Sequence, residues 1–128
     1  MSTRSLIGRT NPDGSVTYIY CHFDGYPEGV GKTLSLHYQD AAKVDALLAL
    51  GDISSLGEEI GTKHSFNDRP AGETTAYGRD RGEKGTEAKT VSSPEAFRET
   101  SSWTEYWYLY GERGWVRAYE DETWIPAY

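Results

Sequence analysis

The feature that most restricts the fold is a pair of aromatic segments near the end of the chain. Residues 103–110, WTEYWYLY, and residues 114–119, GWVRAY, are rich in the aromatic and β-branched side chains that favour strands. The residues between them, 111–114, provide the glycines of a tight turn. The pattern therefore predicts a β-hairpin. Alternation along its first strand gives two rows: Tyr106, Tyr108 and Tyr110 on one face, and Trp107 and Leu109 on the other.

A second hairpin is predicted near the start of the chain. Residues 5–10, SLIGRT, and residues 15–22, SVTYIYCH, have the composition of strands. The sequence between them, NPDG at residues 11–14, is a turn signal, because proline presets φ and glycine accepts positive φ. The two strands should therefore pair across this turn.

Helices are expected in the middle of the chain. Residues 30–38 have helical apolar spacing, and so do residues 41–50, AAKVDALLAL. Asp40 is suited to cap the start of the second helix, and Gly51 to end it. A brief helix should begin after Ser93, where a proline occupies the first helical position.

Three further segments complete the expected arrangement. Residues 74–77, TTAY, are a short strand candidate, and the tail at residues 122–128, ETWIPAY, should add an edge strand. Pro126 restricts that tail to an edge, because proline has no N–H to donate to an inner ladder. Residues 78–90, GRDRGEKGTEAKT, are rich in glycine and charge, so we expect a mobile loop there.

These elements sum to one α+β domain over residues 1–128. The expected sheet is mostly antiparallel, built from two β-hairpins plus a short strand, with two helices on one face. A chain of 128 residues fits one domain and can bury roughly two-thirds of its unfolded surface. Mean hydropathy is low at −0.69, but 13% of the residues are aromatic, and each aromatic ring buries a large area.

Charge and cysteine content restrict the partners. The net charge of −7 argues against binding to duplex nucleic acid, which needs basic patches, and permits an acidic surface aimed at a basic partner. The single cysteine, Cys21, excludes an internal disulfide and indicates a reducing compartment. No signal peptide or membrane span is visible. We therefore expect a cytoplasmic protein, with a homo-oligomer left open.

The sequence GVGKT, residues 29–33, resembles the end of the phosphate-binding loop G-x-x-x-x-G-K-[ST]. The first glycine of that loop would fall on Tyr26, and Pro27 removes a backbone donor, so a hydrolytic loop is not predicted. A weaker interpretation remains: unpaired N–H groups near residues 29–33, with the charge of Lys32, could hold an anion. The alternative is that the glycines only permit a turn and close packing.

Two other groups of residues are candidate sites. His22 and Asp24, beside Cys21, could be metal ligands completed by another histidine, but no paired Cys or His spacing supports this, and we expect no metal or cofactor. The alternative for His22 and Asp24 is a hydrogen bond to loop backbone. Arg79 and Arg81 beside Tyr77 could bind phosphate and stack on a base, or could form a solvated loop.

The segment from Ile19 to Gly31, IYCHFDGYPEGVG, resembles a family of small proteins encoded by phages and prophages. The family signature is Y-C-H-[WF]-D-G-Y-P-x-G-V-G, followed by a helix. Further likeness lies in residues 5–7, in Leu34 and His37-Tyr38, and in residues 50–57, so the resemblance covers about the first half of the chain. It implies a phage setting and carries over no catalytic residues. It also makes Tyr26 part of the pattern.

The resulting prediction is a non-catalytic phage accessory protein that counters host defence by sequestering a nucleotide-type messenger. Backbone N–H groups and cationic side chains would hold phosphate, and exposed rings would stack on bases. The predicted ligand-binding residues are His22, Asp24, Tyr26, Gly29, Gly31, Lys32, Thr33, Tyr77, Arg79, Arg81, Trp107 and Tyr108. One alternative is an acidic inhibitor of a host nucleic-acid-binding defence protein of CRISPR or restriction type. Another is a small metal-dependent hydrolase that uses His22 and Asp24.

Overall fold

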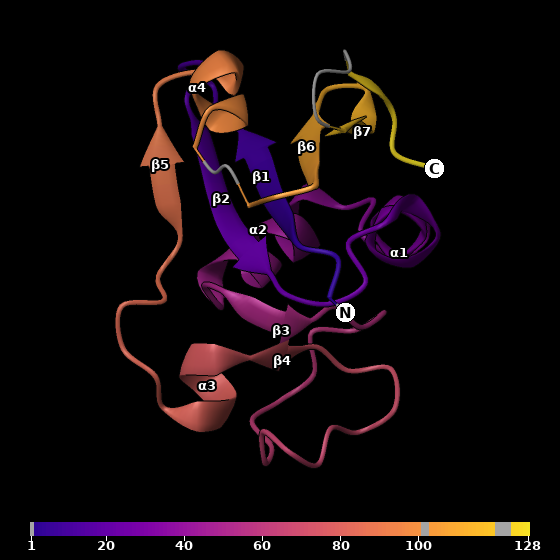
Figure 1. Cartoon of the computed structure of the whole chain (residues 1–128), viewed down its shortest axis with the longest axis vertical. Helices are drawn as coiled ribbons and strands as arrows, with labels where there is room; N and C mark the ends of the chain where they lie inside the picture. Colours follow the sequence, from indigo (N-terminus) through magenta and orange to yellow (C-terminus); the bar gives the residue numbers. More distant parts are fainter. Residues whose placement is uncertain (1, 101–102, 120–123) are drawn as a thin grey trace.

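Both predicted hairpins form, and they are neighbours in one eight-stranded sheet (Figure 1). The computed structural model describes residues 2–100, 103–119 and 124–128. β1 (Ser5–Thr10) pairs antiparallel with β2 (Val16–Cys21), and β6 (Tyr106–Gly111) pairs antiparallel with β7 (Gly114–Tyr119). The hairpins meet through a parallel pairing of β1 with β6, in which Ile7 lies opposite Tyr108.

The remaining strands are short. The order is β4-β3-β2-β1-β6-β7-β8, and β5 also pairs with β2. β3 (Ile53–Ser55) lies parallel to β2, and β4 (Thr75–Ala76) and β5 (Lys89–Val91) add antiparallel pairs. β8 (Ile125–Pro126) lies at the edge beside β7, as Pro126 predicted for the part of the tail within the described residues. The sheet is therefore mixed, because long connections let β1–β6 and β2–β3 pair in parallel.

Within the described residues, five short helical segments connect the strands. η1 (Pro27–Gly31) is a π-helical turn that runs directly into α1 (Lys32–His37), so this helical region begins earlier than the sequence predicted. α2 (Ala41–Ala49) is capped by Asp40, as expected. The others are α3 (Tyr77–Arg81) and α4 (Pro94–Arg98), the latter capped by Ser93. In the part of the chain that the structure describes, no helix has both the length and the apolar character needed to span a membrane.

The sheet has a buried core on each face: the two expected helical regions, α1 and α2, pack on one face, and the brief helix α4 packs on the other. Ile7, Ile19 and Tyr108 face η1, α1 and α2, whereas Leu6, Trp107 and Leu109 face Phe97 of α4. Neither aromatic row is an exposed platform, because Trp107 is 5% exposed and Tyr108 is fully buried. Their polar atoms donate inward, Trp107 Nε1 to the Phe97 carbonyl at 3.1 Å and the Tyr108 hydroxyl to the Gly25 carbonyl at 2.7 Å. Trp107 and Tyr108 are therefore core residues.

Residues 78–90 contain regular structure at both ends, which the sequence did not predict, and residues 82–88 between them form a loop, as expected. The first residues belong to α3, which ends at Gly82 with a φ of 71°. The last residues belong to β5. Between them, the Thr86 carbonyl accepts a hydrogen bond from the Asp52 N–H at 2.7 Å. The charged side chains of residues 81–87 are exposed, as the composition predicted.

Candidate functional site

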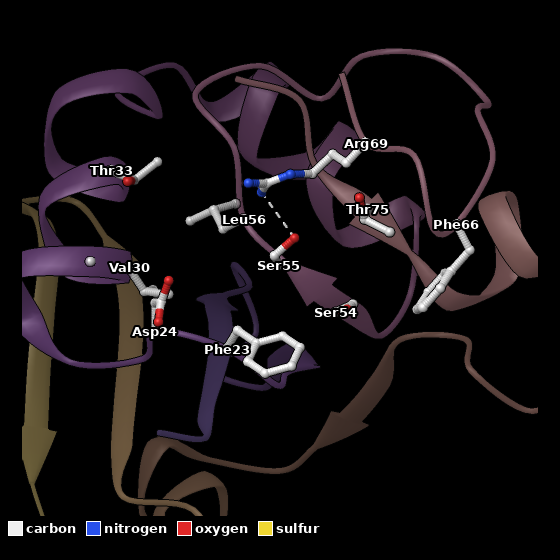
Figure 2. Close-up of a pocket in the computed structure, with 11 residues that line it drawn as sticks. Phe23, Asp24, Val30, Thr33, Ser54, Ser55, Leu56, Phe66, Arg69 and Thr75 are labelled. Carbon is white, nitrogen blue, oxygen red and sulfur yellow. Dashed lines mark hydrogen bonds between the residues drawn. The ribbon is translucent and has the colours of Figure 1, made fainter. Parts of the chain in front are cut away.

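A pocket of about 420 Å³ lies between two segments far apart in the sequence (Figure 2). One wall is the 23–33 segment, which includes η1 and the start of α1. The other is the 56–74 loop, which connects β3 to β4 and lies at the lower end of the view in Figure 1. The end of β3 and the start of β4 lie between the two walls. The lining residues are Phe23, Asp24, Gly29, Val30, Thr33, Ser54, Ser55, Leu56, Phe66, Arg69 and Thr75.

The 23–33 segment folds so tightly that its glycines are needed for packing. A Cβ on Gly29 would lie 2.3 Å from the Asp24 carbonyl oxygen, and one on Gly31 would lie 2.5 Å from the Ala127 carbonyl oxygen. The Gly29 N–H donates to the Tyr26 carbonyl at 3.0 Å, and the Val30 N–H donates to the Asp24 carbonyl at 2.9 Å. These donors are consumed inside the turn. Gly29 and Gly31 therefore provide close approach, and the N–H groups of Gly29 and Val30 are not free to bind an anion.

Asp24 is the one non-glycine residue with positive φ among the described residues, at 57°. Aspartate tolerates this left-handed conformation better than most residues do. The conformation turns the chain out of β2 and places Phe23 and Asp24 side by side in the pocket wall (Figure 2). Both side chains are exposed there, Phe23 to 44%.

The opposite wall contributes a cation and a ring that the sequence analysis missed. Arg69 donates from one guanidinium nitrogen to Ser55 Oγ at 3.0 Å (Figure 2). Phe66 stacks on Tyr77 with ring centres 5.5 Å apart, and the Arg81 guanidinium lies 4.4 Å from the Phe66 centroid. Tyr77 and Arg81 therefore contact Phe66, which lines the pocket, although neither of them lines the pocket itself. The stretch FNDR at residues 66–69 had no periodicity to single it out.

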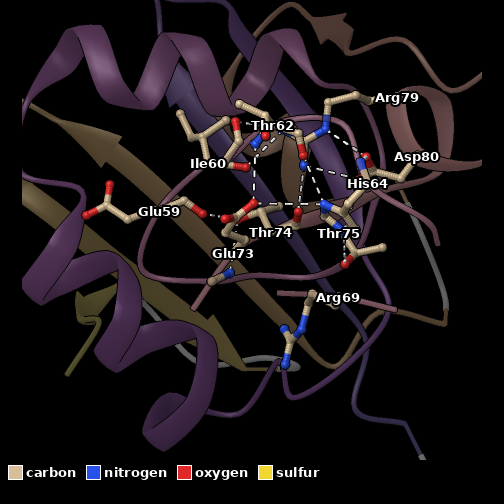
Figure 3. Close-up of polar contacts among 12 residues, drawn as sticks. Glu59, Ile60, Thr62, His64, Arg69, Glu73, Thr74, Thr75, Arg79 and Asp80 are labelled. Carbon is tan, nitrogen blue, oxygen red and sulfur yellow. Dashed lines mark hydrogen bonds and ion pairs between the residues drawn. The ribbon is translucent and has the colours of Figure 1, made fainter. Parts of the chain in front are cut away.

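A buried polar network anchors the 56–74 loop to α3 (Figure 3). Arg79 donates to the carbonyls of Ile60, Gly61 and Thr74 at 2.9, 3.2 and 2.7 Å, and to both carboxylate oxygens of Asp80. Its donors are thus directed to internal acceptors. Arg79 consequently fixes the loop from within, which corrects its prediction as a ligand-binding residue.

Asp80 and His64 complete this network. Asp80 accepts from the N–H groups of Ala76 and His64 at 2.8 and 3.1 Å, and the His64 ring lies 3.1 Å from Thr75 Oγ1 and 2.9 Å from the Thr62 carbonyl. Burial by itself would raise the pKa of Asp80, but the Arg79 and backbone hydrogen bonds outweigh it and lower that pKa. The network stabilises the loop that carries Phe66 and Arg69.

The other predicted site residues are dispersed. His22 lies 2.7 Å from the Tyr20 hydroxyl and packs its ring edge-on to Phe23, 4.5 Å away. Tyr26 and Lys32 are exposed outside the pocket lining, and Lys32 lies 5.9 Å from the Tyr128 ring centroid. Of the predicted set, only Asp24, Gly29 and Thr33 line the pocket together.

Nothing in the described residues favours metal or thiol chemistry. Across residues 2–100, 103–119 and 124–128, no group of three or more His, Cys, Asp or Glu side chains is placed to hold a metal ion. Cys21 is fully buried, and this burial raises the pKa of its thiol to about 12. The thiol therefore stays protonated at neutral pH and acts as a small core side chain.

Comparison of the chain with family models, with curated proteins and with solved structures finds no match.

Proposed function

We propose that this chain binds a nucleotide-type small molecule in the pocket between the 23–33 segment and the 56–74 loop, and acts by holding it. The observation that carries the proposal is the state of Arg69. In the described residues its guanidinium makes one hydrogen bond, to Ser55 Oγ, and no ion pair. Several N–H donors are thus left for an anionic ligand, and a guanidinium fork matches phosphate geometry.

The rest of the pocket suits such a ligand. The hydroxyls of Ser55, beside Arg69, and of Thr33, in the 23–33 wall, line the same pocket and can donate to phosphate oxygens (Figure 2). Phe23 and Phe66 offer ring surface on which a base can stack. The volume of about 420 Å³ falls in the range of small-molecule sites, roughly 300–1,000 Å³. The proposed mode of binding thus assigns phosphate to Arg69 in place of the glycine turn.

The resemblance of IYCHFDGYPEGVG to a phage and prophage family supports a role against the host. The proposal is that the chain, in the host cytoplasm, lowers the free concentration of a nucleotide messenger of defence. The net charge of −7 favours a second candidate, an acidic inhibitor that docks on a nucleic-acid-binding defence protein. The two candidates make different predictions: a nucleotide should stabilise the isolated chain if the chain binds a messenger, and should not if the chain acts only as an inhibitor of another protein.

Thermal unfolding against a panel of linear and cyclic nucleotides tests the proposal. A ligand at about 100 times its Kd stabilises the folded state by about 2.7 kcal/mol, which raises Tm by several degrees. Arg69→Gln should abolish the rise, because a charge-assisted hydrogen bond to phosphate is lost. Arg113→Gln is the matched control, since Arg113 is exposed in the β6–β7 turn outside this pocket.

Two results would contradict the proposal. One is no rise in Tm with any nucleotide, which would favour the acidic inhibitor. The other is an equal rise for the wild-type chain and Arg69→Gln, which would place the ligand away from this pocket.

A further inference from the structure

The pocket holds an acid without a partner in the described residues, as well as a cation that makes no ion pair there. Within the described residues, no hydrogen bond or ion pair engages the Asp24 carboxylate, although Asp24 lines the same pocket as Arg69. In Figure 2 the two side chains come from opposite walls and are not joined by a dashed line. Each charge is therefore available to a different part of one ligand.

A carboxylate in this position opposes a ligand that is only an anion. An ionised aspartate is acceptor-only, so it repels phosphate and gains from a ligand that presents N–H donors. Phe23, the neighbour of Asp24 in the wall, offers a ring for the flat part of that ligand. The donors should thus lie on the edge of a stacked base.

Purine bases differ in the donors that they offer at this edge. Guanine carries an N1–H and an adjacent N2 amino group, which together match the two oxygens of a carboxylate. Adenine has an acceptor at N1 and a single amino group beside it, so a carboxylate meets one donor and one lone pair. We infer that Asp24 makes the pocket selective for a guanine-type base over an adenine-type base, an inference that rests on the proposed nucleotide binding.

The test is isothermal titration calorimetry with three nucleoside 5′-monophosphates, those of guanosine, inosine and adenosine. Inosine keeps the N1–H and lacks the N2 amino group, so the expected order of affinity is guanosine, then inosine, then adenosine. A bidentate base contact discriminates by about tenfold or more, which is the expected span from the first to the last. The comparison of bases uses the wild-type chain and does not depend on a variant.

Asp24→Asn separates base recognition from electrostatic repulsion. Asparagine also tolerates positive φ, so the turn should be retained, as a thermal melt can verify. Loss of a negative charge alone would strengthen the binding of every nucleotide monophosphate. Base recognition predicts instead that guanosine monophosphate binds about tenfold more weakly, while adenosine monophosphate does not weaken. Glu112→Gln, a charge change in the exposed β6–β7 turn, should leave all three affinities unchanged.

The outcomes separate this inference from the proposed function. Equal binding of the guanosine and adenosine compounds, unchanged in their ratio by Asp24→Asn, would overturn the base selectivity and leave nucleotide binding intact. Absence of binding by all three, together with no stabilisation by any member of the nucleotide panel, would overturn both. The expected order with loss of guanosine binding in Asp24→Asn supports both.

Discussion

The glycines of the 23–33 segment lie where a side chain would collide with neighbouring backbone. Replacing Gly29 by alanine puts a Cβ 2.3 Å from the Asp24 carbonyl oxygen, so the turn that presents Asp24 must shift. We expect Gly29→Ala to lower the free energy of unfolding by about 1–3 kcal/mol in urea denaturation. Gly111→Ala is the control, because no atom lies within 4 Å of its added Cβ, and its effect should stay within about 0.5 kcal/mol. Equal effects of both changes would contradict this reading of the glycines.

Individual site residues were predictable where a local pattern marked them. Asp24, Gly29 and Thr33 stand in the DGYPEGVG segment and its tail, which is distinctive in sequence, and they do line the pocket. Arg69 and Phe66 come from an irregular loop, and only the fold brings them opposite that segment. Arg79 and Arg69 are equally plausible cations in the sequence. The difference between them is that Arg79 has carbonyls and Asp80 within reach, which depends on tertiary structure.

At the scale of elements, a buried charge on α3 anchors the 56–74 loop. Asp80 accepts hydrogen bonds from the Arg79 guanidinium and from the His64 N–H. Because Asp80→Asn leaves the Arg79 charge without its anionic partner, it should lower the free energy of unfolding by about 3 kcal/mol at pH 7. Folding lowers the pKa of Asp80. The ionised carboxylate therefore contributes to the free energy of unfolding above its unfolded pKa of about 4, and this contribution is lost as the pH falls through the pKa of the folded state.

The measurement is the difference in free energy of unfolding between wild type and Asp80→Asn as a function of pH. This difference should be present at pH 7 and shrink below about pH 4. Asp68→Asn, an exposed aspartate in the same loop, should change stability by less than about 0.5 kcal/mol. A difference that grows on acidification would show that Asp80 is not stabilised as an anion in the folded state.

At the scale of elements, local chemistry predicted the hairpins but not their assembly. The NPDG turn joins β1 to β2 and the GERG turn joins β6 to β7, so both hairpins were accessible from the sequence. The parallel pairs β1–β6 and β2–β3 join strands across long connections, and no turn residue encodes them. The strand β5, at the end of the 78–90 stretch, was missed for the same reason, since its pairing with β2 is non-local.

The whole molecule depends on having a core on both faces of the sheet. Phe97, from the five-residue helix α4, is fully buried and packs with Leu6, Val16 and Trp107 on the second face. Phe97→Ala should therefore lower the free energy of unfolding by about 3–5 kcal/mol. Leu36→Ala, which trims a residue 52% exposed on α1, should stay within about 0.5 kcal/mol. Urea denaturation with coincident fluorescence and circular dichroism would check both, and a small effect of Phe97→Ala would mean that α4 is dispensable for the fold.

The most direct test of the account is a two-dimensional ¹H–¹⁵N NMR titration of the whole chain with the nucleotide that raises Tm most. Binding in the proposed pocket predicts that the largest amide shifts fall in the 23–33 segment, at Ser54 to Leu56, and around Phe66 and Arg69. The β1–β2 and β6–β7 turns, which line a separate groove, should change little. Shifts centred on those turns, or none at saturating nucleotide, would contradict the account.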